Sequence, residues 1–273
     1  TQRPVDPSPT RAAPKGGEQE TTASGDRGVS GTGNRRPATS GVPSLPMTIR
    51  ILPDAAALAD AAAEEIARQL SAASGRRDVG LAGGSTPTAA YRRLVAQPVP
   101  WNEVHAWMTD ERHVPIDHLD SNAGMARRTL IDHVPATLHM APWRDSAADA
   151  AAAFERQLGS FLQHGPEGLE PSLVVLGIGD DGHTASLFPG SPALGETERD
   201  FVAVDVPGHG WRLTATLALL ARAHSTVFLV SGSGKAEILA VVLANSCDLP
   251  AARLARAARN PLWLVDKEAA RLL

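Results

Sequence analysis

Apolar and polar positions alternate in a regular way along this chain from Thr48 onward. Short, mostly apolar runs are each followed by a longer stretch in which apolar residues recur at helical spacing. Uninterrupted apolar runs of this length are typical of parallel strands that are buried on both faces. The pattern therefore predicts an α/β fold, with a mostly parallel sheet and helices on both of its faces. The runs are Thr48–Leu52, Val79–Ala82, Val104–Met108, Leu173–Leu176, Thr226–Val230 and Leu262–Val265.

The stretches between these runs carry helix signals. Asp54 is the predicted N-cap of an alanine-rich helix that carries Leu58, Ile66 and Leu70. Pro87, a favoured first-turn residue, is predicted to open the next helix. Further helices are expected from near Ser121, over 146–163, over 235–245, and after the last strand.

Residues 1–46 differ in composition from the rest. They are rich in Pro and Gly, hold no aromatic residue, and contain few large aliphatic ones. Such a segment buries too little apolar surface to offset its ordering entropy. We therefore expect a disordered extension over 1–46 and a single α/β domain over 47–273. Met47, the first methionine, stands where the patterned sequence begins, so we expect the functional protein to start near it.

Composition narrows the classes of partner. The 273 residues carry a formal net charge of −4 and a pI near 6.1, which argues against nucleic acid as the main partner. No apolar run approaches the ~18 residues of a membrane span, and no secretory signal is seen, so we expect no membrane partner and a cytoplasmic location. Cys247 is the only cysteine, which excludes an intrachain disulfide; we expect it to be a small core residue on a helix. The sequence does not give the oligomeric state, and a monomer is our starting expectation.

Four loops that follow predicted strands carry unusual chemistry. Ligands of such folds bind at the carboxyl ends of the strands, so we expect these loops to meet around one site. The loops are 83–86, 109–115, 177–183 and 231–235.

The loop after Leu173–Leu176 joins three glycines to an acidic pair and a histidine. Glycines let backbone N–H groups come close to a ligand. A histidine held by a rigid turn, with a carboxylate nearby, can act as a general base near neutral pH. His183 and Asp181 are therefore the candidate catalytic residues, with a purely structural histidine as the alternative.

The same loop, Gly177–Gly182, also spells the G-x-G-x-x-G of dinucleotide-binding folds. Its acidic pair would place carboxylates where the pyrophosphate should lie. Prolines within Pro189–Pro192 also interrupt the helix that should follow. A dinucleotide site with Asp205 as the ribose-binding acid is disfavoured, although the residues leave it open.

Two further loops suit an anion. Gly83, Gly84, Ser85 and Thr86 offer backbone N–H groups, two hydroxyls and the positive end of a helix, which together can bind phosphate. The alternative is a tight turn capped by one of the hydroxyls. Lys235 follows a glycine turn at a predicted helix start, where the dipole is unfavourable to a cation, so an anionic ligand is its natural partner. A solvated lysine is the alternative there.

The remaining loop contains Asp110-Glu111-Arg112. Arg112 can form bidentate hydrogen bonds with a phosphate or a carboxylate. The alternative is a surface turn in which these charged residues form ion pairs with one another. The histidines lack the spacing of a metal site, so we expect no metal.

Taken in order along the chain, these loops resemble those of the 6-phosphogluconolactonase family over residues from about 48 to 270. The segment that contains His183 is specific, and the others are distinctive as a series. The matching segments are Gly83–Pro87, Asp110–Pro115, Ser121–Asn122, Gly177–Pro189, Arg212–Thr214 and Gly232–Ala236.

The resemblance implies a modified Rossmann-like fold and a carboxylic ester hydrolase of the pentose phosphate pathway. Its substrate and small-molecule partner would be 6-phospho-D-glucono-1,5-lactone, hydrolysed to 6-phospho-D-gluconate without a metal or organic cofactor. His183 would be the general base and Asp181 would orient it. The expected phosphate-binding residues are Gly83, Gly84, Ser85, Thr86, Arg112 and Lys235.

The glucosamine-6-phosphate deaminases, which share this fold, are the nearest alternative. They carry a Glu five residues after the loop histidine, where this chain has Phe188, and an aromatic residue where it has Arg112. A non-catalytic sugar-phosphate sensor would need the same loops. The chain departs from the family at Gly208–Trp211, where prolines are usual, and we assign no role to Arg212.

Overall fold

A seven-stranded sheet forms the centre of the computed structural model, which describes residues 47–73, 75–244 and 247–273. The disorder expected over 1–46 lies outside the described residues. The strands of the large sheet are β1 (Thr48–Leu52), β2 (Arg77–Leu81), β3 (Val104–Met108), β5 (Thr137–His139), β8 (Leu173–Leu176), β11 (Ser225–Val230) and β12 (Pro261–Asp266).

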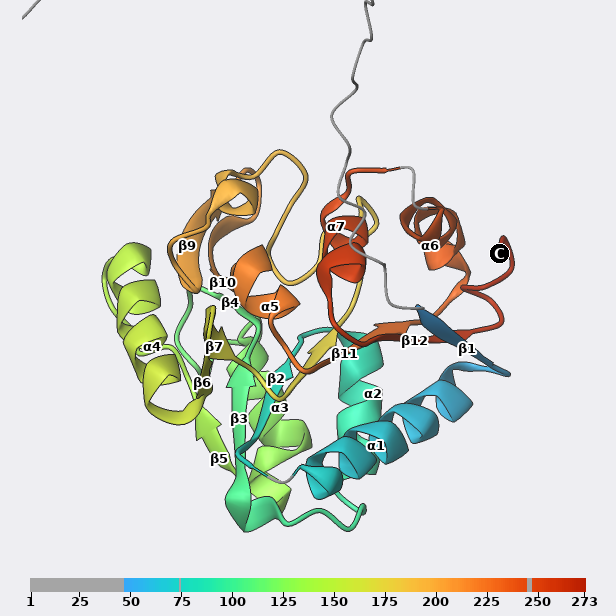
Figure 1. Cartoon of the computed structure of the whole chain (residues 1–273), viewed down its shortest axis with the longest axis horizontal. Coiled ribbons are helices and arrows are strands. Elements are labelled where there is room, and N and C mark those ends of the chain that lie inside the picture. Colours follow the sequence, from blue (N-terminus) through green and yellow to red (C-terminus); the bar gives the residue numbers. More distant parts are fainter. Residues whose placement is uncertain (1–46, 74, 245–246) are drawn as a thin grey trace, which may run out of the picture. The chain divides into compact units, whose positions relative to one another are not determined.

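All neighbouring strands of this sheet pair in parallel, in the order β1-β12-β11-β8-β2-β3-β5 (Figure 1). The chain proceeds outward from β2 to β3 and β5, and in the opposite direction from β8 to β11 and β12. The strand order therefore reverses between β8 and β2. In open α/β sheets this is the place where ligands bind, beyond the carboxyl ends of the strands.

Side chains of the central strands point alternately to two separate hydrophobic clusters. Leu173 and Val175 face the cluster built with α1–α3, whereas Val174 and Leu176 face the cluster built with α4–α7. Figure 1 shows α1, α2 and α3 on one side of the sheet and α5, α6 and α7 on the other. The predicted fold class, a parallel α/β sheet covered on both faces, is confirmed. The helices are α1 (Ala55–Ala72), α2 (Ser85–Leu94), α3 (Asn122–Thr129), α4 (Ala147–Phe161), α5 (Leu217–Ala221), α6 (Ala236–Leu243) and α7 (Pro250–Ala257).

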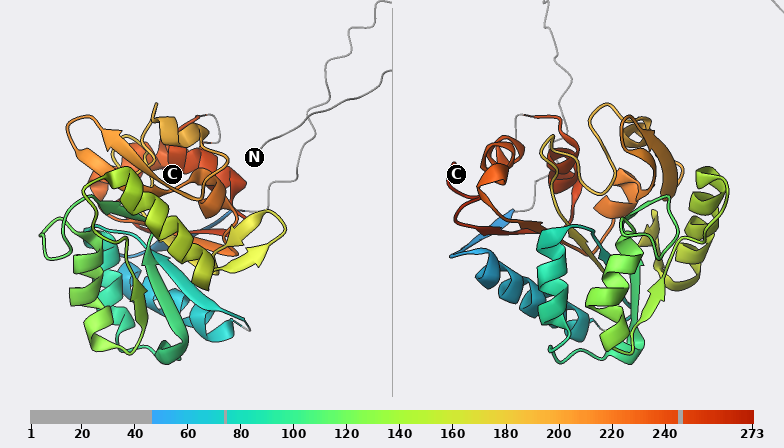
Figure 2. Two further views of the ribbon diagram at one scale, coloured as in Figure 1. Left: turned by 90° about the vertical axis from the view of Figure 1, so that its left-hand side faces the viewer. Right: turned by 180° about the vertical axis from the view of Figure 1, so that it is seen from behind.

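Two small antiparallel sheets were not predicted. β4 (Asp110–Arg112), β10 (Gly210–Ala215) and β9 (Phe201–Val206) form a three-stranded sheet in that order, which α4 packs against. Figure 2 shows it on the same side of the large sheet as α5–α7. β6 (Gln163–Gly165) and β7 (Gly168–Glu170) form a hairpin. β4, β6 and β7 are only three residues long and mostly not apolar, so hydrophobic runs do not reveal them. β9 is largely apolar, so its absence from the predicted strands is an omission.

Several predicted helix ends agree with the structure. Asp54 caps α1, accepting a 2.8 Å hydrogen bond from the N–H of Ala57, and Ser121 caps α3 in the same way. α2 begins at Ser85, two residues before the predicted Pro87, because Gly84 takes the N-cap position. None of the helices in the described part of the chain is both long and apolar enough to cross a membrane.

Two expectations near the C-terminus are wrong. The predicted terminal helix is absent from the described residues, since 267–272 form only turns after β12. So few residues remain there that a helix nucleus has little chain to propagate into. Cys247 lies half-buried in the connection between α6 and α7, not on a helix. α7 itself was not predicted, although Pro250 at its first turn is a recognised start signal.

Candidate active site

His183 and Asp181 form a hydrogen-bonded pair at the end of β8. The ring Nδ1 of His183 lies 2.6 Å from Oδ1 of Asp181, and the same oxygen accepts the backbone N–H of His183 at 3.0 Å. Burial opposes ionisation of Asp181, but these two hydrogen bonds outweigh it and hold the pKa of the carboxyl below its usual value. The carboxylate therefore keeps the Nδ1 proton in place and leaves Nε2 as the nitrogen that can accept one.

Two positions of this turn require glycine, one because the His183 ring lies against it and one because of its backbone conformation. A Cβ on Gly179 would lie 2.0 Å from Nδ1 of His183, and Gly182 has a φ of +82°. The N–H of Gly179 donates to the carbonyl of His183 at 2.8 Å, which closes the turn under the ring. The residues after His183 form turns, not the helix that a dinucleotide-binding fold requires, and Asp205 belongs to the separate three-stranded sheet. The dinucleotide alternative is therefore not supported by the fold.

Phe188 packs against the catalytic candidate. Its ring centroid lies 4.2 Å from that of His183, with the planes tilted by 31°. This contact limits rotation of the imidazole, which is 30% exposed as a side chain. An apolar ring thus occupies the position that carries a Glu in the deaminases named above.

A cleft of about 310 Å³ lies over the carboxyl ends of β2 and β8. Loops from both sides of the strand-order reversal line it, as predicted from the parallel sheet. The predicted site residues in its wall are Gly83, Gly84, Arg112, His183 and Lys235, whereas Asp181, Ser85 and Thr86 are not in the wall. The other lining residues are Ala82, Asp110, Asn122, Gly177, Ile178, Gly179, Asp180, Thr184 and Ala185.

The turn between β2 and α2 presents the start of a helix to this cleft. Gly84 is the N-cap, with a φ of +106°, and no side chain caps the first N–H groups of α2. The alternative in which Ser85 or Thr86 caps the helix is therefore wrong. Uncapped N–H groups at a helix start, together with the helix dipole, favour an anion in front of them.

The short strand β4 brings Arg112 to the other side of the cleft. Its guanidinium Nη1 donates to the carbonyl of Asp120 at 2.6 Å and to Oδ1 of Asn122 at 2.8 Å. Asp110 and Glu111 are each only 8% exposed, so the alternative of a surface ion-pair turn is wrong. Arg112 is fixed by neutral oxygen acceptors, and in the described part of the chain no carboxylate forms an ion pair with it.

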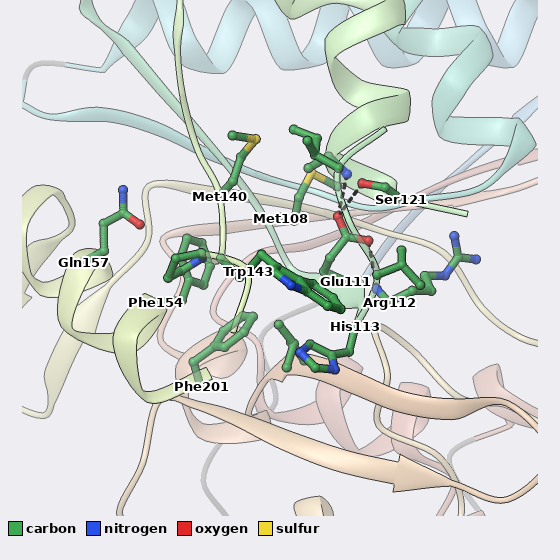
Figure 3. A pocket seen from close by; sticks show the side chains of 16 residues that line it. Met108, Glu111, Arg112, His113, Ser121, Met140, Trp143, Phe154, Gln157 and Phe201 are labelled. Atoms are coloured by element: carbon green, nitrogen blue, oxygen red, sulfur yellow. Dashed lines mark hydrogen bonds between the residues drawn. The ribbon is translucent and has the colours of Figure 1, made fainter. Parts of the chain in front are cut away.

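Glu111 fastens β4 to the start of α3. Its carboxylate accepts hydrogen bonds from the N–H of Ala123 at 2.7 Å, from Oγ of Ser121 at 3.1 Å and from the N–H of Arg112 at 2.8 Å (Figure 3). It also accepts the N–H of Asn122 at 2.7 Å. Burial raises the pKa of Glu111, and the backbone hydrogen bonds work in the opposite direction. The carboxylate satisfies the free N–H groups of α3 in the manner of a cap.

Asn122 is a site residue that sequence reasoning did not assign a role. It is 2% exposed, its amide donates to the carbonyl of Asp110 at 3.0 Å, and its Oδ1 receives Arg112. A Cβ on Gly83 would lie 2.0 Å from this oxygen, so the first glycine of the β2–α2 turn is needed to admit Asn122. Asn122 thus links the two sides of the cleft.

Asp110 is a buried carboxylate in the wall of the cleft to which sequence reasoning assigned no role. Oγ of Ser186 donates to it at 2.7 Å. Burial raises the pKa of Asp110, although the hydrogen bond from Ser186 and the charge of Arg112 oppose the shift.

Lys235 reaches the cleft from the turn after β11. Its ammonium donates to the carbonyl of Ile178 at 2.8 Å and to Oδ1 of Asp180 at 2.6 Å. The alternative of a freely solvated lysine is therefore wrong. Asp266, at the end of β12, fixes the turn by accepting the N–H of Gly232 at 3.0 Å. This contact joins residues far apart in the sequence, so no local motif could have revealed it.

A second, more apolar cavity of about 380 Å³ lies behind β4. In Figure 3 the indole of Trp143 lies between Phe154 on one side and Glu111 and His113 on the other. Apart from Arg112, no residue of the cleft wall lines this cavity, and the His183–Asp181 pair is not part of it. Across residues 47–73, 75–244 and 247–273, no three His, Cys, Asp or Glu side chains are grouped so that they could hold a metal ion.

Comparison with known proteins agrees with this geometry. Residues 53–263 match the family model described as glucosamine-6-phosphate isomerases/6-phosphogluconolactonase. A 6-phosphogluconolactonase from a Nostoc species is 39% identical over 233 residues, which cover 81% of this chain and 96% of that protein.

Solved structures show the same relationship. The 6-phosphogluconolactonase from Trypanosoma brucei is similar with a TM-score of 0.76 and 31% identity, covering 84% of this chain and 100% of that one. A monomeric glucosamine-6-phosphate deaminase is similar with a TM-score of 0.72 but only 19% identity, covering 83% of this chain and 100% of that one. The likeness to the deaminase concerns the fold alone.

Proposed function

The chain belongs to the family of glucosamine-6-phosphate isomerases and 6-phosphogluconolactonases, and we propose that within it this protein is a lactonase. It hydrolyses 6-phospho-D-glucono-1,5-lactone to 6-phospho-D-gluconate. The observation that carries the proposal is that His183, hydrogen-bonded to Asp181, lines a cleft that Lys235 and Arg112 also line. A general base and an anion-binding group in one cleft are what a phosphorylated ester requires.

In the first step, Nε2 of His183 takes a proton from a water molecule as the water oxygen attacks C1 of the lactone. Asp181 stabilises the imidazolium that forms, through its hydrogen bond to Nδ1. The attack converts the C1 carbonyl to a tetrahedral oxyanion. Because the carboxylate also fixes the ring orientation, His183 needs no large rearrangement to act.

In the second step, the oxyanion collapses and the bond between C1 and the ring oxygen breaks. The imidazolium of His183 returns its proton to the ring oxygen, which becomes the hydroxyl of the open chain. The new carboxylic acid then loses its proton to solvent, which leaves neutral His183 ready for another turnover. The balance needs water alone as co-reactant.

The phosphate group is held at some distance from the reacting carbon. Lys235, Arg112 and the turn Gly83–Thr86 supply two cations and the positive end of α2. Binding energy from this remote group positions C1 against the water, so it can raise the turnover rate as well as the affinity. Within the turn, Gly83 and Gly84 contribute through their backbone, and Ser85 and Thr86 through the first turn of the helix.

Phe188 favours the lactonase over a deaminase. Ring opening of an amino sugar needs an acid–base group next to the loop histidine, and an apolar ring packs there instead. The lactone is already a cyclic ester and needs no such group. A sensor without turnover remains the other candidate from the sequence, and only catalysis separates it from an enzyme.

The test is lactone hydrolysis itself. The phosphorylated lactone is generated in situ and its loss is followed with the wild type and with His183→Ala, against the spontaneous rate. Acceleration that disappears in the variant supports both the activity and the base. A folded wild type that gives no acceleration would overturn the proposal, and release of ammonia from glucosamine 6-phosphate would then identify the deaminase.

The proposal extends to the biological setting. We place the enzyme in the pentose phosphate pathway and in the cytoplasm, as a monomer. Sedimentation of the purified protein at micromolar concentration tests the monomer, and fractionation of its host cells tests the location.

A further inference from the structure

The ammonium of Lys235 is paired with acceptors of the protein itself. It donates to Asp180 and to the carbonyl of Ile178, both of which belong to the loop after β8, whereas Lys235 follows β11. β8 and β11 are parallel neighbours, so their carboxyl ends bring the two loops together. The same ammonium is the group that we expect to bind the phosphate. An anionic ligand and Asp180 therefore compete for one cation.

The two acceptors differ in how firmly they are held. Ile178 is 7% exposed and contributes a backbone carbonyl, which cannot leave without moving the end of β8. The side chain of Asp180 is 87% exposed, whereas that of Lys235 is 28% exposed. Within the described residues no second donor to the Asp180 carboxylate is found. Rotation of one exposed side chain therefore frees the ammonium, while the carbonyl keeps it in position.

We propose that Asp180 is an exchangeable counter-ion of Lys235, which neutralises the ammonium in the empty cleft and is displaced by the phosphate group. The inference rests on the proposed function in so far as Lys235 is taken to bind phosphate. Asp180 touches no reacting atom and is a residue that sets anion affinity. Its presence lowers the affinity of the cleft for every anion that needs Lys235, and leaves neutral sugars unaffected.

The size of the effect follows from the strength of the pair. Exposed ion pairs are weak, so displacement of Asp180 raises the apparent dissociation constant of an anion by only about twofold to sixfold. In return, the ammonium is not left with an unsatisfied charge at the start of α6, where the helix dipole already disfavours a cation. Asp180 thus lowers the affinity for an anion slightly while it neutralises the ammonium, whose position is kept by the carbonyl of Ile178.

Asp180→Asn tests the inference because it keeps the shape of the side chain and removes its charge. Inorganic phosphate is the probe, titrated by calorimetry into the full-length protein, so the result does not depend on turnover. Asp205→Asn is the matched control, since Asp205 is an exposed acid on β9 outside the cleft. We expect phosphate to bind about twofold to sixfold more tightly to Asp180→Asn and with unchanged affinity to Asp205→Asn.

The Lys235→Met background shows whether the effect acts through the ammonium. There Asp180→Asn should no longer change phosphate binding, which a general change in charge would still do. Weaker or unchanged binding to Asp180→Asn in the wild-type background overturns the inference, and so does the absence of phosphate binding to both proteins. Weaker binding would mean that Asp180 holds Lys235 in place for the ligand.

A second measurement separates this inference from the proposed function. The preference for the phosphorylated over the unphosphorylated lactone should rise in Asp180→Asn. A wild type that binds phosphate but hydrolyses neither lactone refutes the lactonase and leaves the phosphate titration to decide on Asp180.

Discussion

Arg112 and Arg212 lie directly opposite each other on the antiparallel strands β4 and β10. Burial and then the charge of Arg112 lower the pKa of the Arg212 guanidinium. Like charges opposite each other in a sheet destabilise it, so this pair is best accommodated when an anion is bound nearby. Arg212 does not itself line the cleft, but it lies opposite Arg112, which does.

We expect Arg212→Gln to stabilise the ligand-free protein by up to about 1 kcal/mol, the cost of a cross-strand pair of like charges. The same variant should gain less thermal stability from added phosphate than the wild type gains. Thermal midpoints with and without phosphate measure both effects. An unchanged phosphate-induced shift would exclude Arg212 from the anion site.

His183→Ala should lower kcat by roughly 10²- to 10⁴-fold, because it removes the proton acceptor. Steady-state hydrolysis of the phosphorylated lactone measures this, with spontaneous opening subtracted. Retained turnover would remove His183 from the mechanism.

Gly179→Ala should slow the reaction strongly without unfolding the protein. The added methyl group would lie 2.0 Å from Nδ1 of His183 and force the ring away from Asp181. A displacement of about 1 Å costs roughly 10²-fold in rate. The matched control is Gly195→Ala, since a Cβ there meets nothing within 4 Å. Far-ultraviolet circular dichroism confirms folding, and equal activity of the two variants would contradict the assigned geometry.

Asp110→Asn should stabilise the protein at pH 8, because the folded state then no longer has to bury a carboxylate. Burial raises the pKa of Asp110, so the folded state binds more protons than the unfolded state above the unfolded value of 3.8. Wild-type stability therefore falls as pH rises through the interval between 3.8 and the raised pKa. The stabilisation by Asp110→Asn should accordingly shrink as the pH is lowered towards 4.

Urea midpoints across this range measure the effect, with Asp205→Asn as the exposed-acid control. A lower urea midpoint for Asp110→Asn than for the wild type at pH 8 would contradict this. The interactions of the ionised carboxylate would then stabilise the folded protein by more than its burial destabilises it.

His139 should make the fold sensitive to mild acid. Burial and the neighbouring His105, whose Nδ1 lies 2.8 Å from Nε2 of His139, lower the pKa of His139 to about 4. The unfolded state, with a pKa of 6.5, then binds more protons, so stability is complete above pH 6.5 and is lost as pH falls towards 4.

His139→Gln should flatten this dependence, whereas exposed His133→Gln should not. Urea midpoints between pH 7.5 and pH 5 compare the three proteins. Parallel curves for the wild type and His139→Gln would assign the acid sensitivity to other groups.

The sequence predicted the parts of this molecule that depend on local pattern. Leu173–Leu176 and Thr226–Val230 are buried strands because they are apolar throughout, and a parallel sheet then brings their following loops together. His183 and Asp181 could be found because both lie in one short turn. Their site roles stay predictions until turnover is measured.

The parts that were missed depend on contacts between distant segments. β4 is three residues long and entirely charged, so nothing in its sequence distinguishes it from a surface turn. Glu111 caps α3 only because the fold places the start of α3 beside β4. Asp266 fixes the turn before Lys235 by accepting the N–H of Gly232, which lies 34 positions away in the sequence. Ser85 and Thr86 were expected in the cleft, but Gly84 takes the cap position and leaves them on the helix.

The reversal of strand order between β2 and β8 also bears on how the enzyme becomes active as it folds. These strands are joined by only two register pairs, Val79 with Leu173 and Gly80 with Val174, although almost a hundred residues separate them in the chain. The glycine turn after β2 and the turn with His183 after β8 face each other only after β2 has paired with β8. Non-local pairing of this kind is slow compared with helix formation. Recovery of catalysis after denaturation therefore requires this long-range pairing, and a refolding intermediate that is rich in helix but lacks the pairing is catalytically inactive.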